Sequence, residues 1–234
     1  MSADIRYIFF DLDDTLLDHK QAEKQSLLAC HRELEMLHEV AADHLVQTYR
    51  SINAQLWDQY SKGEIDRATL SRKRFENTMT SLNLRSADAE AFRQVYMSKY
   101  RGFWDWIPGA KMTWEKVRSE WPVGIITNGF SETQKEKFQR FGFDLTAHSL
   151  VISEDIGVMK PHPHIFSYAA DCAQFPPEQI LYVGDSPQTD IVGAAASGYR
   201  TAWFKQHAHP GHDHVTADLI FESFDQLETW LGLP

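Results

Sequence analysis

Cysteine is scarce in this chain: its 234 residues contain only two, Cys30 and Cys172. Both fall in stretches with helical hydrophobic spacing, so we expect reduced thiols in a cytoplasmic protein and no disulfide framework. Long apolar runs are missing as well, since the longest are about four residues and a membrane-spanning helix needs about 20. The first residues lack the apolar segment of an export signal. We therefore expect no membrane partner.

Basic residues are in deficit. Lys and Arg number 23 against 33 Asp and Glu, which gives a formal net charge of −10. A chain with this balance repels a phosphate backbone, which argues against a nucleic-acid polymer as partner. With 43% hydrophobic and 24% charged residues, the composition is that of an ordinary globular protein. Its length suffices for one domain with an insertion.

Short β-branched and aromatic runs recur along the chain and predict buried parallel strands. They occupy residues 5–11, 123–127, 150–152, 180–184 and 201–204. Helical spacing occurs near residues 110–120, 131–141, 163–174, 187–197 and 223–231. Strands that alternate with helices in this way predict an α/β fold with a Rossmann-like, doubly wound parallel sheet.

Residues from about 20 to 104 follow a different pattern. Apolar side chains recur there at helical spacing, as in Leu45, Tyr49 and Leu56, and no strand-like run interrupts them. This pattern predicts a bundle of about four helices. Because the bundle follows the first strand, it interrupts the sheet domain. We assign residues 1–17 and 108–234 to the sheet domain and residues 18–107 to the inserted bundle.

Three carboxylates stand close together where the first predicted strand ends, at Asp11, Asp13 and Asp14. Like charges at the end of a buried strand repel one another, so such a cluster is typical of a cation site or a catalytic site. The alternative is a polar turn or a helix start, because both of these also favour Asp and Thr.

Three further polar motifs follow predicted strands. Thr127 and Asn128 end one strand, Lys160 lies in the loop after the next, and Asp185 and Asp190 follow the fourth. In an open parallel sheet the carboxyl ends of the strands form one edge, where ligands bind. We therefore expect all four motifs to converge at that edge.

With these motifs in this order, the sequence resembles the haloacid dehalogenase-like hydrolase superfamily over essentially its whole length. Motif one spans Asp11 to Thr15, motif two is Thr127, motif three is Lys160, and motif four is Asp185 with Asp190. The resemblance implies that Asp11 attacks phosphorus and forms an acyl-phosphate, which water then hydrolyses. Asp13 would protonate the leaving group and deprotonate the water. Superfamily members that cleave carbon–halogen bonds lack this second aspartate, so Asp13 favours a phosphatase.

A phosphate and a carboxylate repel each other, so this reaction needs a cation. The resemblance implies Mg²⁺, held by the carboxylates of Asp11 and Asp185 and by the backbone carbonyl of Asp13. Asp190 is expected behind these ligands, as a residue that supports them.

Phosphate binding is expected from Lys160, Thr127 and Asn128. The ammonium of Lys160 would neutralise the nucleophile and one phosphate oxygen, while the Thr127 hydroxyl and the Asn128 amide bind the others. Taken alone, Lys160 reads as a solvated surface lysine. Its position among the other motifs favours a catalytic role.

Within the superfamily, an inserted helical bundle is a cap that selects small phosphate esters, so we expect a small-molecule substrate. Residues 49–65 and 74–75 resemble the cap of the pyrimidine 5′-nucleotidase branch. Trp57 or Tyr60 would stack on a base, and Asn53 would bind its edge. Trp57 fits the core of the bundle equally well. The resemblance thus predicts a phosphatase of pyrimidine nucleoside 5′-monophosphates.

Other functions stay open at this point. Residues 131–137 are similar to N-acylneuraminate-9-phosphate phosphatases, and a flavin mononucleotide or sugar-phosphate phosphatase is a further alternative. A noncatalytic regulatory protein on this fold should have lost catalytic groups, which are all present here. His207, His209, His212 and His214 are residues of the type that binds zinc or nickel, but their spacing fits no strong site and favours an exposed loop. The sequence leaves open a monomer or a homodimer.

Overall fold

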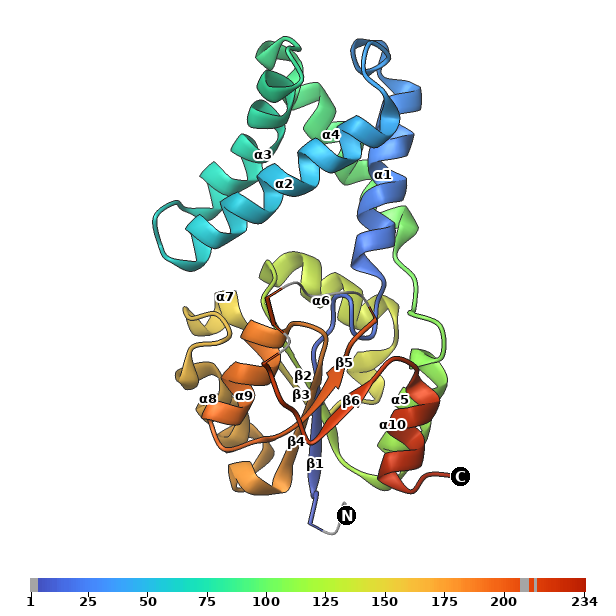
Figure 1. Ribbon diagram of the computed structural model, residues 1–234, viewed down its shortest axis with the longest axis vertical. Helices are drawn as coiled ribbons and strands as arrows, with labels where there is room; N and C mark the ends of the chain where they lie inside the picture. Colours follow the sequence, from blue (N-terminus) through green and yellow to red (C-terminus); the bar gives the residue numbers. More distant parts are fainter. Residues whose placement is uncertain (1–3, 207–210, 213) are drawn as a thin grey trace. The chain divides into compact units, whose positions relative to one another are not determined.

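The computed structural model describes residues 4–206, 211, 212 and 214–234. They form two compact units (Figure 1). The sheet unit comprises the chain up to Asp18 and from Trp106 onward, and the helical unit is His19–Asp105. In the structure, the first segment of the sheet unit ends at residue 18, one residue later than the boundary assigned from sequence. The helical unit ends at residue 105, two residues earlier than the boundary assigned from sequence. No helix within the described ranges is long and apolar enough to cross a membrane.

The sheet unit is built on parallel strands in the order β3-β2-β1-β4-β5-β6. The strands are β1 (Tyr7–Phe10), β2 (Val123–Thr127), β3 (Ser149–Ile152), β4 (Ile180–Gly184), β5 (Arg200–Phe204) and β6 (Leu219–Phe221). In the central strand β1, Ile8 is in register with Val123 of β2 and with Leu181 of β4. The predicted α/β, doubly wound parallel sheet is confirmed, and β6 is a strand that the sequence ranges did not include.

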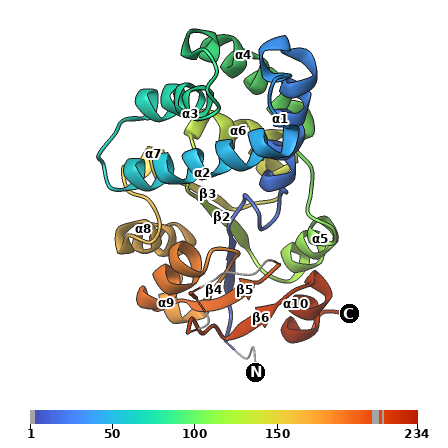
Figure 2. The ribbon, with the colours of Figure 1, turned by 45° about the horizontal axis from the view of Figure 1, so that its top comes forward.

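Successive side chains of β1 point to opposite faces of the sheet, as the pleat of a strand requires. Ile8 and Phe10 belong to a hydrophobic cluster that includes residues of α5 (Ala110–Glu120) and α10 (Phe224–Leu231). Tyr7 and Phe9 belong to a second cluster, with residues of α8 (Pro163–Ala173) and α9 (Gly193–Ala196). Figure 2 shows these two helix pairs on opposite sides of the sheet. Because β1 is buried on both faces, it holds the start of the following loop in a fixed position.

Shorter elements complete the sheet unit. They are α6 (Ser131–Arg140), α7 (Ser153–Ile156), the 3-10 turns η4 (Phe143–Leu145) and η5 (Pro177–Gln179), and the π-helical turn η6 (Pro187–Val192). The helix expected at 187–197 is thus divided into η6 and α9. Wide π-helical turns occur frequently at functional sites, and η6 contains Asp190.

The helical unit contains α1 (His19–Glu33), α2 (Ala42–Ser61), α3 (Arg67–Ser81) and α4 (Ala89–Tyr100). The 3-10 turns η1 (Glu35–Leu37), η2 (Ser86–Asp88) and η3 (Arg101–Phe103) lie between or after them. Its core is aromatic: the ring centroids of Phe75 and Phe92 are 5.1 Å apart, and those of Tyr49 and Tyr96 are 5.3 Å apart. The inserted helical bundle expected from the periodicity is confirmed.

Candidate active site

The loop after β1 is a tightly bonded turn that begins with Asp11. The amide of Asp11 donates to the carbonyl of Val183 on β4 at 2.8 Å, and the amide of Asp14 donates to the carbonyl of Leu17 at 2.7 Å. Asp14 has a φ of 63°, a left-handed conformation that Asp adopts more readily than most residues. Asp14 therefore shapes the turn, while the side chain of Asp11 is buried at the edge of the sheet.

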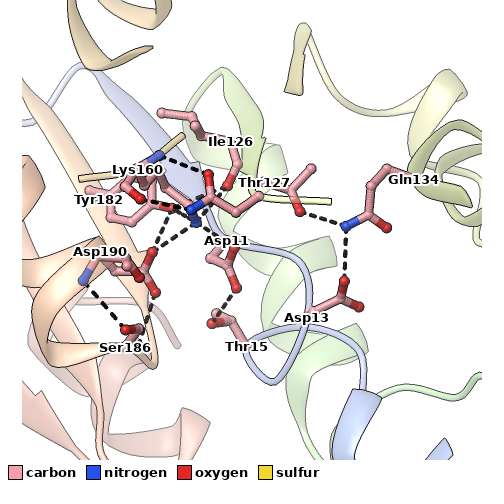
Figure 3. Close-up of polar contacts among 12 residues, drawn as sticks. Asp11, Asp13, Thr15, Ile126, Thr127, Gln134, Lys160, Tyr182, Ser186 and Asp190 are labelled. Carbon is pink, nitrogen blue, oxygen red and sulfur yellow. Dashed lines mark hydrogen bonds and ion pairs between the residues drawn. The ribbon is translucent and has the colours of Figure 1, made fainter. Parts of the chain in front are cut away.

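Lys160 joins the first and the last of the four motifs. Its ammonium lies 2.6 Å from Oδ1 of Asp11 and 2.8 Å from Oδ1 of Asp190 (Figure 3). It also donates to the hydroxyl of Tyr182 at 2.8 Å and to the carbonyl of Ile126 at 3.1 Å. Lys160 is only 3% exposed, so it is not the solvated surface lysine that it resembles when considered alone.

Burial and charge act on these groups in opposite directions. Burial raises the pKa of Asp11 to about 7, and the neighbouring ammonium of Lys160 opposes that rise. Burial alone would lower the pKa of Lys160, but the carboxylates of Asp11 and Asp190 outweigh it and the net shift is upward. Lys160 therefore stays charged across the physiological range, and its charge favours the carboxylate form of Asp11.

Asn128 holds the loop that contains Lys160. Its side-chain nitrogen donates to the carbonyl of Lys160 and its side-chain oxygen accepts from the amide of Lys160, both at 2.8 Å. This paired contact fixes the backbone from which the lysine side chain extends. The Asn128 side chain thus bonds to the protein itself, and phosphate binding by its backbone amide stays a prediction.

Three carboxylates form the group of acidic residues best suited to a metal ion. Asp11, Asp185 and Asp190 each have an oxygen within 4.8 Å of the other two. A Cβ on Gly184 would lie 2.5 Å from Oδ2 of Asp190, so the strand end is kept free of a side chain where Asp190 packs. Carboxylate oxygens are the donors that Mg²⁺ prefers, and this excess of negative charge fits a divalent cation. The residues present therefore fit the expected ion.

The side chain of Asp13 contacts α6. Its Oδ1 is paired with the ammonium of Lys137 at 2.5 Å, and its Oδ2 accepts from Nε2 of Gln134 at 2.8 Å. The same Gln134 nitrogen donates to the hydroxyl of Thr127 at 2.7 Å. The structure thus joins motif one to motif two through a helix to which the sequence analysis assigned no chemical role.

Sequence reasoning missed Gln134, Lys137 and Tyr182 as parts of this site. Gln134 and Lys137 are three positions apart and therefore share one face of α6. That spacing was the available signal, but α6 is so polar that both residues read as solvent-facing. Tyr182 read only as one more apolar residue of a buried strand.

The expected specificity residues all lie on α2 of the helical unit. Asn53 is buried and its side chain donates to Oε2 of Glu23 at 3.3 Å. Trp57 and Tyr60 are half-buried, with ring centroids 5.6 Å apart in an edge-to-face contact. Trp57 is therefore not enclosed in the aromatic core of the bundle, in contrast to the buried Leu56 before it.

The histidine-rich segment is only partly described. His207 and His209 lie outside the described residues. The rings of His212 and His214 are stacked with centroids 6.4 Å apart. Among the described residues, the one candidate metal group consists of the three aspartates above.

Comparison with known proteins places this geometry in a family. The sequence model of the haloacid dehalogenase-like hydrolase family matches residues 5–198. The chain is 30% identical over 226 residues to pyrimidine 5′-nucleotidase YjjG of Escherichia coli K12, covering 96% of this chain and 97% of the relative. It is 31% identical over 210 residues to glyceraldehyde 3-phosphate phosphatase of Pyrococcus furiosus, covering 86% of this chain and 81% of the relative.

A solved structure agrees with the family match and with the two relatives. The magnesium-bound crystal structure of the putative hydrolase YfnB from Bacillus subtilis superposes with a TM-score of 0.84 at 26% identity, covering 98% of this chain and 99% of that one. Family match, fold and relatives therefore give the same assignment. The chain belongs to the haloacid dehalogenase-like hydrolases.

Proposed function

We propose that this enzyme hydrolyses phosphate monoesters through a phosphorylated Asp11, and that its substrates are pyrimidine nucleoside 5′-monophosphates. The observation that carries the proposal is the buried Asp11 carboxylate held 2.6 Å from the Lys160 ammonium, with the second carboxylate of Asp13 two residues further on. A dehalogenase needs the first of these carboxylates but has no proton to deliver to a departing halide. The second carboxylate therefore supports phosphate chemistry.

Asp11 is the proposed nucleophile. One of its carboxylate oxygens bonds to phosphorus while the bond from phosphorus to the ester oxygen breaks, and the departing oxygen takes a proton from Asp13. Water then bonds to phosphorus and gives a proton to Asp13, while the bond from phosphorus to Asp11 breaks. Inorganic phosphate and an alcohol leave, and both carboxyl groups return to their starting protonation states.

Lys160, Thr127 and the Asn128 backbone amide are the proposed phosphate ligands. Lys160 stays protonated beside Asp11 and can neutralise a phosphate oxygen where charge develops during transfer. The carboxylates of Asp11 and Asp185 and the carbonyl of Asp13 would hold Mg²⁺, which supplies charge neutralisation for the phosphate when bound. Asp190, paired with Lys160 and accepting from the Ser186 amide at 3.0 Å, would orient these groups.

Two observations support a pyrimidine nucleotide as the substrate. The relative YjjG is named as a pyrimidine 5′-nucleotidase and aligns over 96% of this chain. In the helical unit, Trp57 and Tyr60 keep exposed aromatic surface, which is suited to stacking on a base. We assign residues 18–107 the role of a cap on this basis. A sugar-phosphate phosphatase is the second candidate, favoured by the likeness to glyceraldehyde 3-phosphate phosphatase.

A substrate panel tests the proposal. The enzyme is assayed with Mg²⁺ against uridine, thymidine, cytidine and adenosine monophosphates, glyceraldehyde 3-phosphate, N-acetylneuraminate 9-phosphate and flavin mononucleotide. We expect the pyrimidine nucleotides to show the highest kcat/KM, and Asp11→Asn to abolish turnover. A clear lead for another ester would refute the pyrimidine assignment while leaving the phosphatase intact. Near-normal turnover by Asp11→Asn would refute the covalent mechanism.

A further inference from the structure

Two buried side chains of α6 hold the carboxylate that transfers protons in the proposed reaction. Lys137 and Gln134 are each 1% exposed, and together they engage both oxygens of Asp13. We propose that Gln134 and Lys137 are positioning residues, which hold Asp13 and Thr127 as one hydrogen-bonded unit. This inference rests on the proposed function, because it assigns proton transfer to Asp13.

The burial of Lys137 supports a specific purpose. An ammonium taken out of water is costly unless a charged partner compensates it. On the same helix, Lys135 pairs with Asp155 at 2.9 Å, and its side chain is 55% exposed, as is usual for a surface pair of little energetic value. The side chain of Lys137 is 2% exposed in its pair with Asp13. The helix thus contains one ordinary surface lysine and one lysine directed into the site.

Gln134 links two motifs that are far apart in sequence. An amide nitrogen carries two hydrogens, and Nε2 of Gln134 donates to Oδ2 of Asp13 and to Oγ1 of Thr127. Because the Thr127 hydroxyl accepts from Gln134, its own hydrogen is left to donate to another acceptor, such as a phosphate oxygen. Oε1 of Gln134 is buried without a hydrogen-bond partner among the described residues. Burying an amide oxygen without a hydrogen bond costs stability, and the two hydrogen bonds from the Gln134 nitrogen to Asp13 and Thr127 explain why the amide is kept there.

The backbone next to Gln134 leaves room for this contact. A Cβ on Gly129 would lie only 2.2 to 2.7 Å from three atoms of the Gln134 side chain, so that side chain would have to move away from its present position. Gln134 can reach Thr127 and Asp13 only because position 129 has no side chain. The glycine at position 129 thus leaves the space that the Gln134 side chain occupies.

Separate cations pair with Asp11 and Asp13 of motif one. Lys160 pairs with Asp11, and Lys137 pairs with Asp13. Each of these carboxylates is therefore oriented by a cation from a different element.

The test uses two esters of similar shape, p-nitrophenyl phosphate and phenyl phosphate. The p-nitrophenolate released from the first ester needs little protonation as it departs. The phenolate released from the second is more basic and depends on protonation. Positioned proton transfer contributes about 10²- to 10⁴-fold. We therefore expect Lys137→Met and Gln134→Met each to lower kcat/KM for phenyl phosphate about tenfold more than for p-nitrophenyl phosphate. Lys137→Arg should recover part of the loss.

Matched controls come from the exposed face of the same helix. Lys135→Met and Gln139→Met should leave both kcat/KM values within about twofold of the unaltered enzyme. In an Asp13→Asn background, Lys137→Met should also cost no more than about twofold, because a residue that acts through Asp13 alone has nothing left to orient. Gln134→Met should keep only the part of its cost that comes from the lost contact to Thr127, and that part should be equal for the two esters.

Equal losses for the two esters, or undiminished losses in the Asp13→Asn background, would overturn the positioning role. If Lys137→Met does not fold, as judged by its circular dichroism spectrum, the Gln134→Met arm decides the same comparison. Failure of the unaltered enzyme to hydrolyse either ester would overturn the proposed function and this inference together. Hydrolysis with losses that do not depend on the leaving group would overturn this inference alone.

Discussion

Tyr182→Phe removes one hydroxyl that contacts Lys160, the ion-pair partner of the candidate nucleophile. The ammonium of Lys160 has three hydrogens but four partners: the carboxylates of Asp11 and Asp190, the hydroxyl of Tyr182 and the carbonyl of Ile126. Removing the hydroxyl leaves three partners for three hydrogens. Lys160 therefore keeps both of its ion pairs, and the phenyl ring of residue 182 keeps its packing in the sheet.

The expected cost follows from this count. A hydrogen bond to a charged group contributes about 1.5–3 kcal/mol, and the carbonyl of Ile126 recovers part of it. We expect the free energy of unfolding to fall by about 1–2 kcal/mol, which lowers Tm by about 2–8 °C for a chain of this size. Turnover should fall by about tenfold or less, since Asp11 and Asp190 still hold Lys160.

Thermal unfolding and p-nitrophenyl phosphate kinetics measure the two effects on the same preparation. Leu181→Val, a truncation in the buried sheet next to Tyr182, controls for general loss of packing. If Tyr182→Phe reduced turnover by about a thousandfold without loss of Tm, the tyrosine itself, and not the aspartate pair, would set the position of Lys160. An unchanged Tm would show that the hydroxyl contributes nothing to the buried network.

Three further outcomes are expected. Removing bound metal with EDTA should abolish turnover, because the Asp11 and Asp185 group needs a cation, and Mg²⁺ alone should restore it; full activity after metal removal refutes the metal assignment. With EDTA present, Asp11→Asn should become progressively more stable than the unaltered chain as pH rises from 4 to 8. The folded chain holds a proton on Asp11 up to a pKa of about 7, whereas the unfolded chain releases it near 4, so the stability that this proton provides is lost as pH rises through 7; parallel Tm curves would contradict this sign. Trp57→Ala should cost about 1–3 kcal/mol in transition-state binding for a pyrimidine nucleotide and little for p-nitrophenyl phosphate, whereas equal losses with a lowered Tm would identify Trp57 as a packing residue.

The strands that end at the site could be predicted from sequence because they are buried on both faces. β1, β2 and β4 read as short continuous apolar runs, and each is followed at once by a polar motif. Parallel topology then requires those motifs to share an edge. The same rule cannot detect β6, since it has only three residues and Ile220 is 48% exposed.

The contacts made by α6 could not be predicted in this way. Lys137 and Asp13 are 124 positions apart, and Gln134 and Asp13 are 121 apart. A buried glutamine or lysine has the same composition signal as an exposed one, so its burial depends on the packing of the folded chain. The expected helix 187–197 is divided into η6 and α9 where Asp190 pairs with Lys160 at 2.8 Å, a tertiary contact that local propensity does not record.

The strand order has a consequence for how this protein is made on the ribosome. β1 is synthesised before the other strands of the sheet, yet Ile8 pairs with Val123 on one side and with Leu181 on the other. The whole helical unit emerges before either partner strand exists, so it can fold while β1 waits unpaired. Pairings this distant in sequence slow folding, and an unpaired apolar strand is open to association with other chains. Among the strands of this sheet, the one that presents Asp11 is thus the first to be synthesised and the one that waits longest for its neighbours, which makes β1 the strand most in need of chaperone protection during synthesis.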